Sequence, residues 1–160
     1  MKIRLLALLA VLPVIPALCA CTQAAPQAPS EFCAQVRITG SQLPLQGEVA
    51  LCDGVTVLSL SAPANVAGIR YTFADGQLTT SYGEHNAVTA HDQLPPTAAP
   101  EVLYHSLAYL SRAEHLSCDE NGDAFLLNTP YGAATLVCRD GRLLSLTAEY
   151  SPYAFTFSVD

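Results

Sequence analysis

Cysteine is the residue type with the widest range of chemistry in this sequence. The chain has six cysteines, and three of them lie close together in the stretch LCACTQAAPQAPSEFC, residues 18–33. A thiol can be acylated, joined in a disulfide or bound to a metal, and its surroundings in the sequence indicate which. The first three follow an apolar segment, whereas Cys52, Cys118 and Cys138 lie further along the chain. The two groups therefore need separate explanations.

The histidines and acids show no arrangement typical of catalysis or of metal binding. The histidines lack a metal-ligand spacing such as H-E-x-x-H. They are His85, His91, His105 and His115, and we interpret each as a surface or turn residue. The run DENGD, residues 119–123, begins like a calcium loop, but its glycine comes too early and no Glu closes it, so we interpret it as a hairpin turn. The G-x-S-x-G motif of a nucleophilic serine is also missing. We therefore expect no enzyme, no metal and no cofactor.

The N-terminus predicts an export signal. Lys2 and Arg4 form a basic start, and a nearly unbroken apolar run follows from Leu5 to Leu18. This run is shorter than the ~18 residues of a membrane-spanning helix, and its prolines oppose a stable span. A basic start followed by a short apolar core is typical of a secretory signal peptide.

The end of this signal has the form of a lipidation site. Leu18-Cys19-Ala20-Cys21 resembles the bacterial lipobox, in which an aliphatic residue, a small residue and Ala or Gly precede the acylated cysteine. The resemblance implies that Cys21 is diacylated and that residues 1–20 are removed as a lipoprotein signal peptide. Two acyl chains would hold the protein on a membrane surface. The alternative is plain secretion after cleavage near Ala20 or Ala25.

The composition of the chain after the signal predicts a short tether followed by a single domain. Residues 21–31 are rich in Pro, Ala and Gln and have too little apolar surface to pack, which predicts a flexible tether. Residues 32–160 are enough for one domain with its own core. Removal of Lys2 and Arg4 from a chain of net charge −7 leaves a net charge near −9. Such an acidic surface excludes nucleic acid and anionic headgroups as partners, because both bind basic patches.

Turn dipeptides recur through the domain. They are Asp53-Gly54, Asp75-Gly76, Asn121-Gly122 and Asp140-Gly141. Each is flanked by alternating apolar residues, and this combination is the strongest short-range signal of a β-hairpin. The domain is therefore predicted to be mainly β, with an antiparallel sheet of about ten strands that has one apolar and one wet face.

The same alternation predicts which residues face each other. A loop centred on residues 41–44 pairs Val36 with Val49, and this register also sets Cys33 against Cys52. A cross-strand disulfide between these two cysteines is then plausible on the outer face, and the alternative is two free thiols. Cys118 and Cys138 are the two cysteines that remain, so a disulfide between them is inferred only by elimination. The other predicted pairs are Val49–Leu58, Phe73–Leu78, Ile69–Tyr82, Ala148–Phe155, Leu146–Phe157 and Leu144–Val159.

One segment between the two β halves has helical periodicity. Val102, Leu103, Leu107 and Leu110 recur at helical spacing within residues 95–116. We predict one principal helix from Ala99 to Ala113, opened by Thr97 or Pro100. A single helix covers only part of the apolar face of so large a sheet. The predicted architecture is therefore a curved antiparallel sheet that forms a half-open barrel with a helix in its mouth.

The lipobox, the tether and two strand-rich stretches form a wider pattern. The stretches are SLSAPANVAGIRYTFADGQLTTSYGE and the terminal GRLLSLTAEYSPYAFTFSVD. Together they resemble small Firmicutes surface lipoproteins of the LolA-like, outer-membrane lipoprotein-sorting superfamily, over nearly the whole of residues 21–160. The resemblance implies a single LolA-like half-barrel domain whose apolar hollow takes acyl chains.

We therefore expect an exported lipoprotein, anchored through Cys21 to the outer face of the bacterial cell membrane, that binds acyl chains or other apolar ligands. The residues expected to line the hollow are Val36, Val49, Leu58, Ile69, Tyr71, Phe73, Leu78, Tyr82, Leu103, Leu107, Leu146, Phe155 and Phe157. The alternative is a surface interaction or sensory lipoprotein that uses the half-barrel as a scaffold for a protein partner, without a small-molecule ligand. A continuous empty hollow favours the first function, and a hollow filled by its own side chains favours the second.

Overall fold

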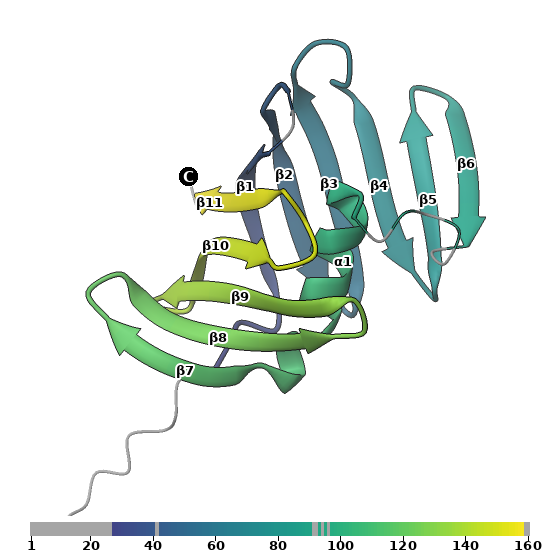
Figure 1. Cartoon of the computed structure of the whole chain (residues 1–160). Coiled ribbons are helices and arrows are strands. Elements are labelled where there is room, and N and C mark those ends of the chain that lie inside the picture. The colour runs from purple at the N-terminus through teal and green to yellow at the C-terminus, as the bar shows by residue number, and fades with distance from the viewer. Residues whose placement is uncertain (1–26, 41, 91–92, 94, 96, 159–160) are drawn as a thin grey trace, which may run out of the picture.

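The computed structural model describes residues 27–40, 42–90, 93, 95 and 97–158. Within these residues lie an antiparallel sheet of eleven strands, an α-helix and a short 3₁₀ helix (Figure 1). The strands are β1 (Phe32–Thr39), β2 (Leu45–Cys52), β3 (Val55–Ala62), β4 (Ile69–Ala74), β5 (Gln77–Tyr82), β6 (His85–Ala90), β7 (Glu114–Asp119), β8 (Gly122–Thr129), β9 (Gly132–Arg139), β10 (Arg142–Ala148) and β11 (Ala154–Ser158). The helices are α1 (Ala99–Ala108) and η2 (Leu110–Arg112).

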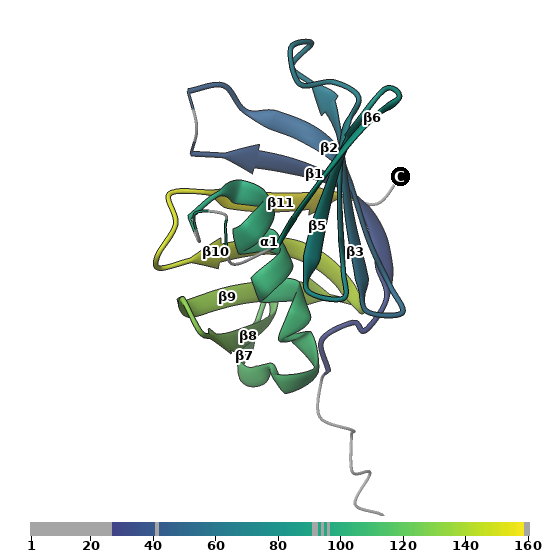
Figure 2. The same ribbon diagram turned by 90° about the vertical axis from the view of Figure 1, so that its right-hand side faces the viewer.

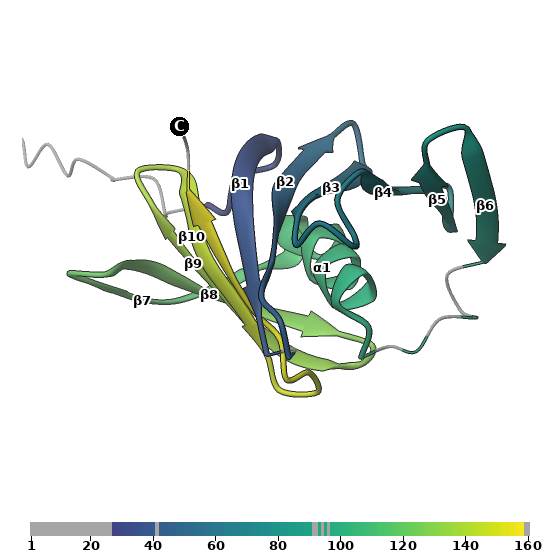
Figure 3. The ribbon, with the colours of Figure 1, turned by 90° about the horizontal axis from the view of Figure 1, so that it is seen from above.

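The sheet consists of two halves that meet at the pairing of β1 with β11. Its strand order is β6-β5-β4-β3-β2-β1-β11-β10-β9-β8-β7. We call β1–β6 the N-terminal wing and β7–β11 the C-terminal wing. The wings are inclined to each other, and α1 lies between them on the concave side (Figures 2 and 3). Among the described residues β6 and β7 are not paired, so the sheet is open, and the prediction of a curved, half-open antiparallel sheet is confirmed.

The two-residue turns have the backbone that tight hairpins require. Asp53 and Gly54 have φ of 50° and 77°, and Asp75 and Gly76 have φ of 50° and 72°. Positive φ at both central residues matches the twist of the flanking strands and sets the register. Opposite these turns the predicted pairs Val49–Leu58, Phe73–Leu78 and Ile69–Tyr82 are confirmed.

Where the connection is longer, the predicted registers are wrong by two residues. Val36 faces Gly47 instead of Val49. At the C-terminus Leu146 faces Phe155 instead of Phe157. A shift of two keeps every side chain on its expected face, so alternation alone cannot detect it. The predicted partner of Leu144, residue 159, lies outside the described residues.

The registers also correct the two predicted disulfides, since all four described cysteines are free. Cys33 faces Ala50, with Cys52 two residues further along β2. Cys118 and Cys138 face Asp123 from opposite sides, with β8 between them. Two strand spacings place their Cα atoms about 10 Å apart, beyond the ~7 Å that a disulfide spans.

The helix is shorter than predicted. α1 ends at Ala108 rather than Ala113, and the chain continues through Tyr109 into η2. Pro100 lies in the first turn, as predicted, whereas the residue at the N-cap is Ala98, without a side-chain cap. No helix in the described part of the chain is long and apolar enough to cross a membrane. Residues 1–20 and Cys21, for which a signal and an anchor are predicted, lie outside the described residues.

Both wings and the helix share one hydrophobic core. The buried cluster includes Val49 and Leu58 from the N-terminal wing, Leu136 and Phe155 from the C-terminal wing, and Leu103 from α1. The helix contacts β3 in one wing and β8 in the other. Because the sheet bends around α1, the two apolar faces cover each other as well as the helix. This bend is why a single helix suffices for most of the apolar surface.

Candidate functional site

Most residues that were expected to line an empty hollow instead fill it. Ten of the thirteen are buried: Val36, Val49, Leu58, Phe73, Leu78, Leu103, Leu107, Leu146, Phe155 and Phe157. Ile69 and Tyr71 are half-buried, and Tyr82 is 59% exposed. The concave side of the sheet is therefore a packed core over most of its extent, and two clefts remain along the flanks of the helix.

The first of these spaces is a cleft of about 270 Å³ between the C-terminal half of α1, η2 and the β2–β3 hairpin. We call it the apolar cleft. Leu51, Leu107 and Leu110 form its apolar walls, together with Ala28 and Ala108. Of the thirteen predicted residues only Leu107 lines this cleft. A concave apolar space between helix and sheet is a common form of ligand site, although this one lies at the small end of the usual range.

A few polar groups surround the apolar walls of this cleft. Thr56 is buried, whereas Ser111 is exposed. Tyr104 contributes a phenol, and burial raises the pKa of that phenol, with a smaller contribution from the nearby Glu101 carboxylate. Its hydroxyl therefore stays protonated at neutral pH and can donate a hydrogen bond. Apolar walls with few polar groups suit a ligand that has a hydrocarbon chain and one polar end.

The end of the predicted tether takes part in the cleft. Ala28 is half-buried and packs against the core cluster. Together with Ser30 it lines the side of the cleft opposite α1. The lack of apolar periodicity in residues 21–31 predicts a flexible tether. A single small side chain that docks on a preformed surface leaves no periodic signal.

The second space lies on the other flank of α1, against the β8–β9 turn. It has a volume of about 220 Å³ and is lined by Tyr104, His105, Ala108, Tyr109, Pro130 and Tyr131. We call it the aromatic cleft, because three phenol rings and an imidazole form its walls. Tyr104 and Ala108 line both clefts, so the two spaces adjoin along the helix.

An acid–base pair lies behind the aromatic cleft. Glu101 and His105 are four residues apart on α1, and the Oε2 of Glu101 is 2.9 Å from the Nε2 of His105. Both side chains are buried, with exposed fractions of 1% and 8%. A buried ionisable group needs a partner, because an isolated charge in an apolar interior is strongly disfavoured. The prediction that His105 is a surface or turn residue is therefore wrong, because its side chain is buried.

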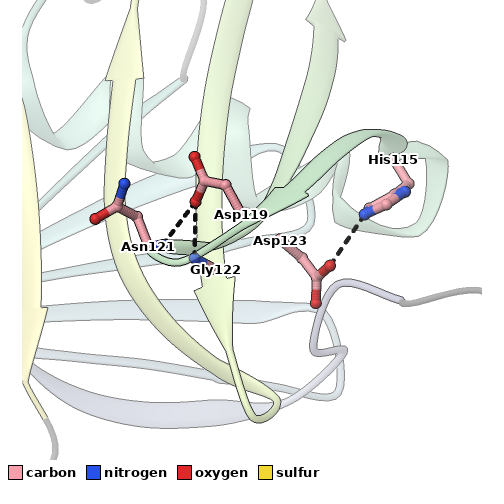
Figure 4. A network of polar contacts seen from close by, with 5 residues as sticks. All are labelled: His115, Asp119, Asn121, Gly122 and Asp123. Carbon is pink, nitrogen blue, oxygen red and sulfur yellow. Dashed lines mark hydrogen bonds and ion pairs between the residues drawn. The ribbon is translucent and has the colours of Figure 1, made fainter.

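The DENGD run forms the turn between β7 and β8. The Oδ1 of Asp119 accepts hydrogen bonds from the backbone N–H groups of Asn121 and Gly122, at 2.6 Å and 3.2 Å (Figure 4). The Nε2 of His115 lies 3.0 Å from the Oδ1 of Asp123 on the neighbouring strand. The predicted hairpin is thus confirmed, and Asp119 serves to close the turn.

Two predicted residues border a different region. Val36 and Phe157 line a polar depression of about 320 Å³, which also includes Gln35, Arg37 and Thr156. Their apolar side chains point to the core, where both are buried. This depression shares no lining residue with the apolar cleft.

Comparisons with known proteins give structural likenesses only. No protein-family model matches the sequence, and no curated protein matches it. A solved structure of an uncharacterized conserved protein from Thermus thermophilus is similar with a TM-score of 0.47 and 11% identity, over 79% of this chain and 75% of that chain. A LolA superfamily protein from Nitrosomonas europaea has a TM-score of 0.41 and 13% identity, over 84% of this chain and 86% of that one. A domain named for outer membrane lipoprotein sorting, from Vibrio parahaemolyticus, has a TM-score of 0.42 and 10% identity, over 81% and 83%.

Proposed function

We propose that this protein is an exported lipoprotein that binds an acyl chain or a similar apolar group in the apolar cleft. The observation that carries the proposal is a concave space of about 270 Å³ between α1 and the β2–β3 hairpin, with leucine walls and a few polar groups. Apolar surface exposed to water costs about 25 cal/mol per Å², so a hydrocarbon chain gains free energy by covering it. Thr56, Ser111 and Tyr104 supply hydroxyls for the polar end of such a ligand.

The binding proposal is tested by titration of a fluorescent fatty acid. All eleven strands and both helices lie within residues 32–158, so residues 21–160 with Cys21→Ser keep every described element and carry no lipid. Saturable binding is expected. Ser111→Phe, which places a ring in the cleft from an exposed position, is expected to weaken the affinity at least tenfold.

The matched control is Ser117→Phe, at an exposed serine on β7 that lines neither cleft. It is expected to leave the affinity unchanged. Binding that is insensitive to Ser111→Phe, or no saturable binding at all, would contradict a ligand site in the apolar cleft.

The anchoring part of the proposal rests on the sequence before the domain. The basic start, the apolar run and the lipobox-like Leu18-Cys19-Ala20-Cys21 support export and acylation at Cys21. The anchored protein would face outward from the bacterial cell membrane, held by acyl chains rather than by charge. In the producing cell Cys21→Ser is expected to leave an unprocessed precursor. Unchanged processing and unchanged partition into a detergent phase would argue against the lipid anchor.

One observation favours the alternative function, a scaffold for protein contacts. The concave face is largely filled by its own side chains, with Val49, Leu146 and Phe155 fully buried. A packed half-barrel can serve as a rigid support for a surface that contacts a protein partner. Failure of the fatty-acid titration on a folded protein would make this alternative the better description.

A further inference from the structure

The aromatic cleft is built to hold its rings in fixed positions. Tyr104 stacks on Phe73 with ring centroids 4.5 Å apart and an interplanar angle of 6°. The His105 ring lies 5.2 Å from Tyr104 and 4.5 Å from Tyr131, tilted by 51° and 59°. Rings that are tilted toward one another in this way form walls of a box rather than a flat stack. The cleft therefore presents more than one aromatic face to whatever enters it.

The β8–β9 turn fixes the position of Tyr131. The hydroxyl of Thr129 donates to the carbonyl of Gly132 at 2.7 Å and accepts from the N–H of Tyr131 at 3.3 Å. Tyr150 packs edge-on against Tyr131, with centroids 6.4 Å apart. Gly132 has φ of 124°, and a Cβ there would lie 2.7 Å from the Tyr150 ring. Glycine thus permits both the turn and the ring contact that supports Tyr131.

Two charged side chains lie close to the rings of the cleft, the acid Glu101 and the base Arg112. The Glu101 carboxylate lies directly behind His105, 2.9 Å from its Nε2, and Glu101 also raises the pKa of Tyr104, although burial contributes more. The whole chain carries a net charge of −7. One ring of the cleft already contacts a cation, because the guanidinium carbon of Arg112 lies 5.5 Å from the centroid of Tyr109.

We propose that the aromatic cleft binds an alkylammonium group, that is, a positively charged nitrogen that carries methyl or methylene groups. Tyr131 and the face of Tyr104 turned away from Phe73 attract the positive charge through their ring quadrupoles, and the alkyl groups cover apolar ring surface. When His105 is neutral, the Glu101 carboxylate adds attraction from behind it. Tyr109 contributes less, because Arg112 already occupies one of its faces.

The position of the cleft suggests the rest of the ligand. Tyr104 and Ala108 also line the apolar cleft, so the two spaces adjoin at the short, exposed side chain of Ala108. A ligand with a hydrocarbon chain and an alkylammonium head would fill both. This extension rests on the proposed function, whereas binding of the head group alone does not.

The test uses choline and its uncharged isostere 3,3-dimethylbutan-1-ol, in which carbon replaces the nitrogen. Both are titrated into residues 21–160 with Cys21→Ser, by calorimetry and by the chemical shifts of the tyrosine rings. Choline is expected to bind saturably and more tightly than the isostere by about 2- to 30-fold, the range of a cation–π contribution. Equal affinities, or no saturable binding of choline, would overturn the proposal.

Variants of Tyr131 identify the site. Tyr131→Leu is expected to weaken choline binding by about 2- to 30-fold, whereas Tyr131→Phe keeps the ring and is expected to keep the affinity. Tyr82→Leu, at an exposed tyrosine far along the sheet, is the matched control and is expected to change nothing. Equal choline affinity in Tyr131→Leu and the original protein would overturn the assignment. The fatty-acid titration on the same protein shows separately whether the apolar cleft binds, so the two proposals fail independently.

Discussion

Two residues of one strand show how differently the inner face of the sheet is used. Leu78 and Tyr82 lie on β5, four residues apart and on the same face. Leu78 is 2% exposed and Tyr82 is 59% exposed. Leu78 faces Phe73, whose ring stacks on Tyr104 of α1, whereas Tyr82 faces Ile69, which is only half-buried. Alternation identifies the face of a strand, and contact with the helix decides which part of that face is covered.

The C-terminal wing repeats this difference with two cysteines. Cys118 and Cys138 both face Asp123, but Cys118 is exposed on the edge strand β7 and Cys138 is 3% exposed on β9. Burial, followed by the nearby Asp123 carboxylate, raises the pKa of Cys138 to about 11. In both wings the covered inner face belongs to the core, and the uncovered inner face is surface.

The largest expected effect on stability is at the end of the β4–β5 hairpin that α1 covers. Phe73→Ala removes a ring that is 1% exposed and the stack on Tyr104. We expect the free energy of unfolding to fall by about 3–5 kcal/mol, since a buried Phe leaves a cavity that neighbours fill only in part. Chemical denaturation followed by circular dichroism measures this change. A loss below about 1 kcal/mol would mean that the helix does not cover this end of the sheet as described.

An intermediate effect is expected where two covered strands approach closely. Gly47 lies on the buried face of β2, and a Cβ there would clash with the carbonyl oxygen of Ser59 on β3. Gly47→Ala is expected to cost about 1–3 kcal/mol, because the β3 backbone must move. Amide hydrogen exchange along β2 and β3 should quicken together with the loss of stability. Unchanged exchange and stability would contradict this close approach.

The smallest expected effect on stability is at the end of β5 that α1 does not cover. Tyr82→Ser replaces a large apolar side chain that is 59% exposed, and we expect the free energy of unfolding to change by no more than about 0.5 kcal/mol. The same denaturation experiment measures it beside Phe73→Ala. A loss near that of Phe73→Ala would show that Tyr82 is covered in solution, and the contrast within β5 would then be wrong.

The amino-acid sequence by itself determined the local features of the fold. The Asp-Gly turns at 53–54 and 75–76 set two hairpin registers correctly, because a two-residue turn leaves no freedom in which residues face each other. Period-two alternation placed Val36 and Phe157 on the inner face correctly even where their predicted partners were wrong. Helical spacing located α1, whose first residue is the predicted Ala99.

Tertiary structure alone decided which parts of the sheet are covered by α1 and by the opposite wing. The two-residue shifts at Val36 and Leu146 preserve every face, so only packing between wings selects the register. The bend of the sheet around α1 turned the predicted hollow into a core and left clefts on the helix flanks. It also brought the ring of Tyr131 to 4.5 Å from that of His105, measured between centroids, although the two residues are 26 positions apart in the sequence. No local pattern records such a contact, because it arises when distant segments pack against the same helix.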